Sequence, residues 1–298
     1  MKILVTGAGG FIGKYVVEEL LKHDIGVIAF DHHEKANDPV PDGVSRFLGD
    51  TRDFTSVSEA VALSDGVIHL AGVLGTQETV NEPRPAVETN IIGGLNVFQA
   101  IRHYRVPAVY IAVGNHWMNN SYSITKTTAE RFAFMFNKEH GTHIAVVRGL
   151  NVYGPRQKAY PVKKIMPNLI MPILKGEPVT IYGDGEQVMD MIHARDIADV
   201  LVRALLQDHG VYDRVFEAGS GNHTTVNEIA KHVTDILGRG EINHVPMRPG
   251  ETERSVVVGD PETLRSLYSG QLPEFIPLAD GIKETVGWYE KNYQAGLI

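Results

Sequence analysis

Short, mainly apolar runs alternate along the chain with longer stretches whose apolar residues recur at helical spacing. The short runs predict buried β-strands at residues 2–6, 27–30, 67–70, 109–113, 144–147 and 215–218. The longer stretches predict helices at residues 14–21, 55–63, 84–104, 122–139, 196–207, 225–238 and 280–292. Residues 34–45, with two prolines and mixed charge, predict a loop. The alternation predicts an α/β fold in which helices cover both faces of a parallel sheet.

A glycine-rich turn joins the first predicted strand to the first helix, with glycines at positions 7, 10 and 13. Gly7 allows a tight turn, Gly10 lets backbone approach a pyrophosphate, and Gly13 lets the helix pack close to the strand. The helix start, which includes Phe11 and Ile12, offers free N–H groups and a positive dipole end to phosphates. The spacing is GxxGxxG, and in this context it predicts a dinucleotide-binding turn.

The second predicted strand ends at Asp31, which is 18 residues after Gly13. An acidic residue at about this distance receives the adenosine ribose 2′-hydroxyl. Asp31 would repel a 2′-phosphate, and the following His32 and His33 provide no arginine to hold one. The sequence therefore favours NAD over NADP as the cofactor.

Bulk properties exclude several classes of protein. The chain has 298 residues, 43% hydrophobic and 21% charged, and its net charge of −8 argues against nucleic acid or an anionic membrane as a partner. There is no cysteine, and no pair among the 13 histidines has acidic partners at ligand spacing, so we expect no metal site. No run has the length of a membrane span, and the first strand leaves no room for a signal peptide, so we expect a cytoplasmic enzyme.

The clearest candidate for chemistry is Tyr122-Ser-Ile-Thr-Lys126 at the start of a predicted helix. The i, i+4 spacing places Tyr122 and Lys126 on one face of that helix. An ammonium close to a phenol favours the phenolate, so we expect Lys126 to lower the pKa of Tyr122 and make it an acid/base near neutral pH.

Together these stretches resemble the extended short-chain dehydrogenase/reductase superfamily, and within it the NAD-dependent nucleotide-sugar epimerase/dehydratase group typified by UDP-glucose 4-epimerase. The resemblance covers essentially the whole chain. It rests on VTGAGGFIGKYV, GDTRD (49–53), HLAG (69–72), ETNIIGGLNV (88–97), YSITK, NVYGPRQ, IYGDGEQ (181–187), MIHARDIAD (191–199) and RPGE.

The resemblance implies a Rossmann-type doubly wound parallel sheet with a smaller C-terminal α/β substrate lobe. The pattern along the chain changes after Asn151, and it suggests an NAD-binding domain of residues 1–154 plus 187–217. The substrate lobe would then comprise residues 155–186 plus 218–298.

The resemblance also implies a role for individual residues. At the cofactor it places Asp50 and Thr51 against the adenine, and it places Leu70, Ala71 and Gly72 along the ribose and phosphates. It gives Asn90 a supporting role in the site and places Lys126 on the nicotinamide ribose. Tyr122 would be the acid/base on a sugar hydroxyl. At the substrate it places Asn151 at a phosphate, Asn168 and Leu169 along the nucleotide, Tyr182 against the base and Arg248 on the diphosphate.

The sequence departs from this group at the strand that precedes Tyr122. Most members carry a Ser or Thr there that hydrogen-bonds the reacting hydroxyl, whereas this chain has Val113 and Gly114. The nearest polar replacements are Asn115, His116, Ser121 and Ser123, and for His116 an ordinary loop histidine is the favoured interpretation. The connection from residue 113 to 122 is also short, and Trp117 and Met118 are expected to provide an apolar wall.

A second departure concerns the substrate diphosphate. The group usually has an arginine where this chain has Met189, so one of two expected cations is absent. Arg156, Lys163 or Lys164 would have to replace it; alternatively, the substrate is not a standard nucleotide diphosphate-sugar.

We therefore expect an NAD-dependent epimerase that acts on a nucleotide-diphosphate sugar at C4 through a transient 4-keto intermediate. Dehydration, decarboxylation of a uronic acid or reduction of a keto-sugar are alternatives, although the carboxylates of the dehydratase branch are missing at residues 113–115. A non-catalytic dinucleotide sensor is a further alternative, which the presence of Tyr122 and Lys126 disfavours.

The resemblance further implies a homodimer joined through two helices per subunit, here residues 84–104 and 122–139. Phe132, Phe134 and Phe136 cannot all face one core from a single helix, so we expect some of them to face a partner. Packing between the two lobes is the alternative.

Overall fold

The fold is built around a seven-stranded parallel sheet in the order β11-β6-β5-β4-β1-β2-β3, seen in a computed structural model that describes residues 1–32, 41–160, 162, 164–207, 210 and 212–298. The strands of this sheet are β1 (Lys2–Thr6), β2 (Gly26–Asp31), β3 (Val44–Leu48), β4 (Gly66–His69), β5 (Ala108–Val113), β6 (Ile144–Gly149) and β11 (Val215–Ala218). Except in the edge strand β3, their hydrophobic runs are buried because helices cover both faces of the sheet.

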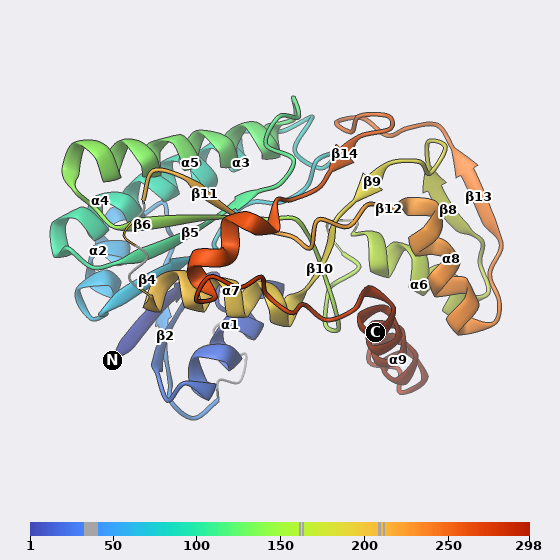
Figure 1. Cartoon of the computed structure of the whole chain (residues 1–298), viewed down its shortest axis with the longest axis horizontal. Helices are drawn as coiled ribbons and strands as arrows, with labels where there is room; N and C mark the ends of the chain where they lie inside the picture. Colours follow the sequence, from blue (N-terminus) through green and yellow to red (C-terminus); the bar gives the residue numbers. More distant parts are fainter. Residues whose placement is uncertain (33–40, 161, 163, 208–209, 211) are drawn as a thin grey trace.

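Helices lie on both faces of this sheet and form two apolar cores with it (Figure 1). One face packs against α1 (Phe11–Lys22) and α7 (Ala194–Leu206), and the other against α2 (Phe54–Ala62), α4 (Gly94–Tyr104) and α5 (Ser121–His140). The Rossmann-type α/β sheet expected from the sequence is therefore confirmed.

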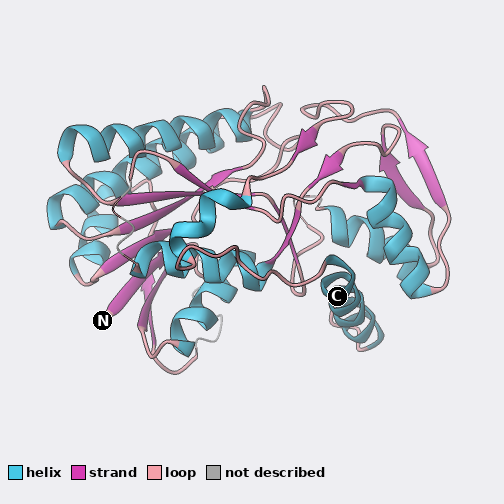
Figure 2. Ribbon diagram, viewed as in Figure 1, coloured by secondary structure: helices cyan, strands magenta, loops and turns pink. Residues whose placement is uncertain are grey.

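A second group of elements lies beyond the carboxyl ends of the strands and has an apolar core of its own (Figures 1 and 2). Its helices are α6 (Ile165–Lys175), α8 (Val226–Leu237) and α9 (Leu278–Gln294). Its strands are β7 (Asn151–Tyr153), β8 (Val179–Tyr182), β9 (Val188–Met189), β10 (Met191–His193), β12 (Thr224–Thr225), β13 (Ile242–Val245) and β14 (Val256–Val257). The 3₁₀-helix η3 (Pro261–Leu267) packs Leu264 and Leu267 into the core of the large sheet instead. The exact division of the chain into two domains stays a prediction.

The predicted strands and helices agree with the structure to within a few residues, with two exceptions. The expected loop at 34–45 lies partly outside the described residues, and its last two residues begin strand β3. Strand β3 is an edge strand without fully buried residues, so its hydrophobic pattern was too weak to predict it. The helix expected at 84–104 is continuous, but its middle is a π-helix, η2 (Val87–Gly93), between α3 (Arg84–Ala86) and α4.

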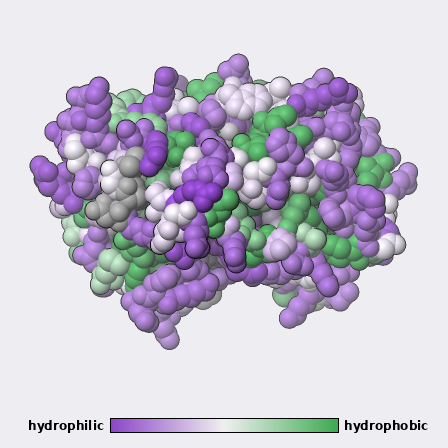
Figure 3. Space-filling view, viewed as in Figure 1, coloured by the Kyte–Doolittle hydropathy of each residue, from purple (hydrophilic) through white to green (hydrophobic). Residues whose placement is uncertain are grey.

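The visible face of the molecule carries hydrophobic residues in separate groups among hydrophilic ones (Figure 3). No helix among the described residues is long and apolar enough to cross a membrane.

The buried carboxylate of Asp190 connects the segments that pass between the two groups of elements. It is fully buried and accepts hydrogen bonds from the Ser220 N–H and hydroxyl at 2.9 and 2.7 Å. It also accepts the N–H groups of Gly221 at 2.9 Å and Gly259 at 3.2 Å. Backbone N–H groups from two segments that are distant in the sequence donate to this one side chain. Asp190 therefore fixes how β9 and β10 meet the loops that follow β11 and β14.

Replacing this carboxylate should destabilise the whole protein. In Asp190→Ala, four donors lose a charged acceptor, and we expect unfolding free energy to fall by more than about 3 kcal/mol in urea denaturation. The control is Asp235→Ala, which removes an exposed ion pair with Lys231 and should leave the denaturation midpoint almost unchanged. Equal, small effects of the two substitutions would contradict a structural role for Asp190.

Candidate active site

The glycine turn has the geometry that its spacing predicted. Gly7 has a φ of +72°, and the Gly10 N–H donates to the Gly7 carbonyl at 2.9 Å. A Cβ on Gly13 would overlap the carbonyl oxygens of Gly7 and Ala8, so only glycine lets α1 approach the turn. Helix α1 has no side-chain cap at Gly10, which leaves its first N–H groups available for an anion.

Asp31 closes this turn from the neighbouring strand. Its Oδ2 accepts the Gly9 N–H at 2.8 Å, and its Oδ1 accepts the His32 N–H at 3.0 Å. Each oxygen retains capacity for a further donor, as binding of a ribose hydroxyl requires. His33 lies outside the described residues.

Thr6 ties the end of β1 to the end of β4. Its hydroxyl is 3.2 Å from the N–H groups of Leu70 and Ala71, and 2.7 Å from His69 Nδ1. Burial lowers the pKa of His69 to about 3, so this histidine is neutral at physiological pH. His69 was not predicted as a site residue, although it lies in the HLAG motif.

Gly72, Asn90 and Lys126 meet beside this strand end. A Cβ on Gly72 would lie 2.9 Å from Asn90 Oδ1 and 4.0 Å from Lys126 Nζ. Asn90 lies in the π-helix, accepts the Val73 N–H at 2.8 Å and donates to Thr125 Oγ1 at 2.9 Å. Asn90 therefore links the loop after β4 to the helix that carries Lys126. Because a Cβ on Gly72 would clash with Asn90, glycine lets the loop after β4 pack closely against the π-helix.

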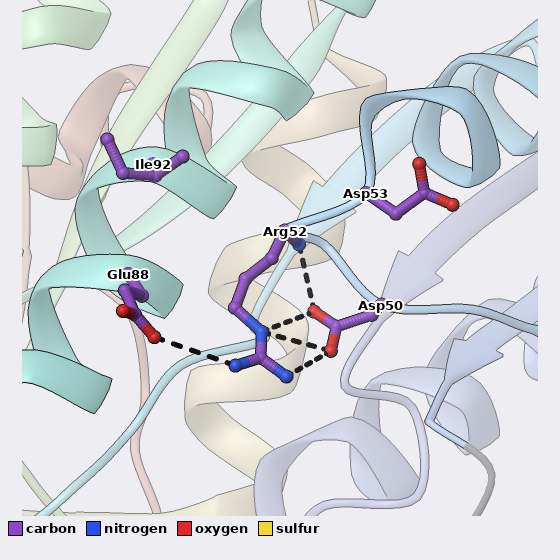
Figure 4. A pocket seen from close by; sticks show the side chains of 5 residues that line it. All are labelled: Asp50, Arg52, Asp53, Glu88 and Ile92. Carbon is purple, nitrogen blue, oxygen red and sulfur yellow. Dashed lines mark hydrogen bonds and ion pairs between the residues drawn. The ribbon is translucent and has the colours of Figure 1, made fainter.

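A pocket of about 430 Å³ lies where the adenine was expected (Figure 4). Asp50 binds Arg52 with oxygen–nitrogen distances of 2.6 to 3.0 Å, and Glu88 lies 3.7 Å from the same guanidinium. Thr51 is buried against Gly93, and its carbonyl accepts the Asn96 amide at 2.9 Å. Arg52 and Glu88 were not predicted as site residues, although both lie in the motifs that revealed the family.

The predicted acid/base pair lies on α5, but its ionisation differs from the expectation. Lys126 is buried with its ammonium 4.2 Å from the centre of the Tyr110 ring, and desolvation lowers the pKa of Lys126 to about 7. Desolvation raises the pKa of the half-buried Tyr122 to about 12. The expected lowering by Lys126 was wrong for the protein alone, because burial dominates at Tyr122 and Lys126 itself tends to lose its charge.

A buried ion network lies behind Lys126 on the same helix. Arg148 on β6 binds both carboxylate oxygens of Glu130, at 2.6 and 3.0 Å, and binds Glu217 at 3.2 Å. The Glu130 carboxylate favours the protonated form of Lys126 and so opposes the effect of burial on its pKa. This network holds α5 against the sheet at the level of the site.

The end of β5 has no space for the hydroxyl that most members of the group carry. A Cβ on Gly114 would overlap Leu150 and lie 3.3 Å from Val257. Among the suggested replacements, His116 is half-buried with its ring nitrogen 3.2 Å from the Gly114 carbonyl. The Ser123 hydroxyl is buried and has no hydrogen-bond partner among the described residues. Of the expected apolar wall, Met118 is buried and Trp117 is exposed.

The residues predicted to bind substrate occupy the neighbouring elements. Asn151 begins β7 and donates from its amide to the Asp190 carbonyl at 3.3 Å. Asn168 is half-buried on α6, whereas Leu169 is buried in the lobe core, so the side chain of Leu169 packs away from solvent. The guanidinium of Arg248 lies 5.2 Å from the centre of the Tyr182 ring. Their roles toward a substrate stay predictions.

No group of three or more metal-ligating side chains is found within the described part of the chain.

Comparison with known proteins identifies the family. Residues 3–219 match the NAD dependent epimerase/dehydratase family. The chain belongs to this family. The UDP-glucose 4-epimerase of Thermotoga maritima, solved with UDP-glucose, is 29% identical in sequence with a TM-score of 0.88, and the match covers 98% of this chain and 100% of that epimerase. The UDP-glucose 4-epimerase of Thermus thermophilus, solved with NAD, is 29% identical with a TM-score of 0.85, and the match covers 97% of this chain and 99% of that epimerase.

A relative with a different activity is also similar. The dTDP-glucose 4,6-dehydratase of Mycolicibacterium smegmatis is 26% identical over 98% of this chain and 94% of its own length. The chain is therefore an enzyme of an NAD-dependent family that includes both epimerases and dehydratases.

The residues of this chain fit NAD. The Gly7–Gly13 turn presents bare backbone beside the open start of α1, and Asp31 lies next to that turn with acceptor capacity to spare. Asn90 and Lys126 provide polar groups beside Gly72. Dinucleotide binding needs these features: close backbone approach, a helix start and polar groups for the riboses.

A side chain at position 13 should abolish dinucleotide binding. Gly13→Ala forces α1 away from the turn, so we expect the purified variant to lose bound NAD and its affinity for added NAD to fall at least about tenfold in calorimetry. Gly287→Ala is the control, because a Cβ there meets no atom within 4 Å and should leave NAD binding unchanged. Normal NAD binding by Gly13→Ala would contradict the assignment.

Removing the buried ammonium should stabilise the dinucleotide-free protein in a pH-dependent way. With a folded pKa of about 7 against an ordinary 10.5, Lys126 binds fewer protons in the folded state, so stability rises between these pH values. Lys126→Met should therefore have a higher unfolding free energy than wild type at pH 7, and the difference should shrink towards pH 10.5. Lys138→Met, at an exposed site, should show no such change. A pH-independent difference for Lys126→Met would assign the effect to packing.

Proposed function

We propose that this protein epimerises a nucleotide-diphosphate sugar at C4 through a transient 4-keto intermediate, with NAD as its bound cofactor. The observation that carries the proposal is the position of Lys126 beside Asn90 and Gly72, four residues after Tyr122 on α5 and next to the strand end that contacts the glycine turn. Two solved UDP-glucose 4-epimerases, each 29% identical over almost the whole chain, support the choice of reaction and substrate class.

The protein's own groups handle the proton. When bound, NAD supplies the acceptor and donor for the C4 hydride. Tyr122 accepts the proton of the C4 hydroxyl as the C4–H bond breaks, and it returns that proton when hydride is delivered to the other face of the 4-keto sugar. With the pKa of Tyr122 near 12, little of this side chain is phenolate at neutral pH. In the complex, a hydrogen-bond donor to the Tyr122 oxygen must therefore stabilise the phenolate. Lys126 provides positive charge when protonated, and Asn90 holds the helix in place.

The alternatives make different chemical demands. Dehydration needs acid and base groups near the sugar, and the end of β5 has Val113, Gly114 and Asn115 instead of carboxylates. Decarboxylation after oxidation at C4 needs fewer catalytic side chains than dehydration. It is therefore the alternative that requires the fewest residues beyond Tyr122 and Lys126. A reductase would consume external cofactor, and a non-catalytic sensor would not need Tyr122 and Lys126.

We also propose a cytoplasmic homodimer. Helix α5 exposes Ile124 (51%) and Met135 (37%), and the π-helix exposes Val87 (40%). Apolar side chains on two adjacent helices would be covered by the same helices of a second copy. Contrary to the expectation that they could not all face one core, Phe136 is buried in the core of the sheet, and Phe132 and Phe134 are partly buried against the same core.

The direct test is proton NMR of the purified protein mixed with UDP-, dTDP-, GDP- and CDP-sugars, with no cofactor added. Conversion of one sugar to its 4-epimer is the expected result. Loss of water or carbon dioxide would replace epimerisation by dehydration or decarboxylation. Turnover that requires added NADH or NADPH would instead indicate a reductase.

Replacing Tyr122 should remove catalysis but not binding. In Tyr122→Phe the proton has no acceptor, so we expect kcat to fall about 10²- to 10⁴-fold while bound NAD and substrate affinity are retained. Tyr104→Phe, which changes an exposed tyrosine on α4, is the matched control and should keep full activity. An unchanged kcat in Tyr122→Phe would rule out the mechanism.

A further inference from the structure

Tyr122, Lys126 and Glu130 form a single row along α5, each one turn of helix after the last. Lys126 and Glu130 are both buried, with 3% of each residue exposed, on the face of the helix that packs against the sheet. Opposite charges interact more strongly in such surroundings than in water. The carboxylate of Glu130 therefore has a large influence on whether Lys126 keeps its proton.

The ion network that holds Glu130 carries an excess of negative charge. Arg148 binds both carboxylate oxygens of Glu130, at 2.6 and 3.0 Å, and one oxygen of Glu217 at 3.2 Å. Two carboxylates thus share one guanidinium, which leaves a net charge of minus one within this group of three. An uncompensated buried charge is unfavourable, and protonated Lys126 supplies the charge that balances it.

Elements from across the sheet hold this network in place. Glu217 lies on β11, and its second oxygen accepts the Asp260 N–H at 3.0 Å. The Glu217 N–H donates to the Thr263 hydroxyl of η3 at 2.9 Å. Arg148 lies on β6, between β5 and β11 in the sheet. The position of the Glu130 carboxylate is therefore set by α5, two strands and η3 together.

The other titratable groups that face Lys126 add no charge to it. His69 on β4 acts on Lys126, and Tyr110 on β5 donates its hydroxyl to the Lys126 carbonyl at 3.1 Å. Burial lowers the pKa of His69 to about 3 and raises the pKa of Tyr110 well above its ordinary value, so both are uncharged at neutral pH. Asn90, which approaches from the π-helix, is uncharged as well. The charge of Lys126 therefore depends on burial and on Glu130.

The place of one proton decides whether the catalytic pair can act as a base. When Tyr122 and Lys126 hold a single proton between them, either a phenol lies beside a neutral amine or a phenolate lies beside an ammonium. The two forms hold the same number of protons, so pH does not select between them. Glu130 lies one turn from Lys126 and two turns from Tyr122, so its charge favours the form with the ammonium and the phenolate.

We propose that Glu130, held by Arg148 and Glu217, keeps the proton on Lys126 and so makes Tyr122 the member of the pair that gives up its proton. Glu130 is then a positioning residue, because it acts on the sugar through Lys126 and Tyr122. The phenolate so formed accepts the proton of the C4 hydroxyl. This last step rests on the proposed function, whereas the effect of Glu130 on Lys126 does not depend on the reaction.

The test follows the titration of Lys126 itself, by carbon-13 NMR of the lysine Cε in the NAD-bound protein, with the signal assigned by its loss in Lys126→Met. Glu130→Gln should move this titration at least about one pH unit lower, because it removes the nearest negative charge. Glu217→Gln should move it in the same direction by less. Arg148→Met removes the balancing cation and should move it to higher pH. The matched control is Glu139→Gln, at an exposed site on the same helix, which should change nothing.

Turnover provides the second measurement. In Glu130→Gln we expect kcat on a converted sugar to fall about tenfold or more with KM unchanged, because less of Tyr122 is phenolate. The acidic limb of the kcat–pH profile should move to lower pH together with the titration of Lys126. Glu139→Gln should keep the profile of wild type.

Several results would overturn the inference. An unchanged titration of Lys126 in Glu130→Gln is one, and a shift in the same direction in Glu130→Gln and Arg148→Met is another, because a loss of packing does not depend on the sign of the charge removed. If Glu130→Gln does not fold, as thermal melting and bound NAD would show, Glu217→Gln and Arg148→Met must still shift in opposite directions. A shifted titration with an unchanged kcat would overturn the link to Tyr122. If Lys126 responds as expected but no sugar is converted, the proposed function fails while the effect of Glu130 on Lys126 stands.

Discussion

The buried carboxylate of Asp190 is the constraint on which the relation of the two lobes depends. Four donors from the segments after β11 and β14 end on it, while its own carbonyl accepts the backbone N–H of Asn151. The chain crosses between the seven-stranded sheet and the second group of elements at these segments. If cofactor and sugar bind on opposite sides of this junction, as proposed, its rigidity matters, because small displacements between reacting groups reduce rates strongly.

A second theme is that the site buries ionisable groups which the protein alone does not fully satisfy. His69 is held neutral, Lys126 tends to lose its proton, and Tyr122 holds its proton tightly. Arg248 keeps two donors unpaired among the described residues. At neutral pH the lowered pKa of Lys126 and the unpaired donors of Arg248 oppose folding stability, and a ligand that pairs with these groups would offset that cost. Catalytic capacity and stability of the free protein are therefore in conflict at Lys126.

Much of the fold could be predicted from the sequence, because the buried strands and amphipathic helices are local patterns. The glycine turn and its partner Asp31 were likewise predictable from spacing alone. Strand β3 was missed because an edge strand has little apolar periodicity. The ionisation of Tyr122 was predicted wrongly, because spacing brings a lysine near but does not reveal burial or the contact of Lys126 with Tyr110. The partner of Arg156, Glu18, lies 138 positions away in the chain and could not be predicted from local spacing.

The central claim is that one hydrogen leaves C4 of the sugar and returns to the same carbon on its opposite face. The most direct measurement follows a nucleotide-sugar deuterated at C4 by NMR and mass spectrometry as the protein converts it, in ordinary water. The account predicts that the epimeric product retains the deuterium at C4, with none in solvent. Loss of the deuterium to water, or its appearance in added NADH, would contradict it.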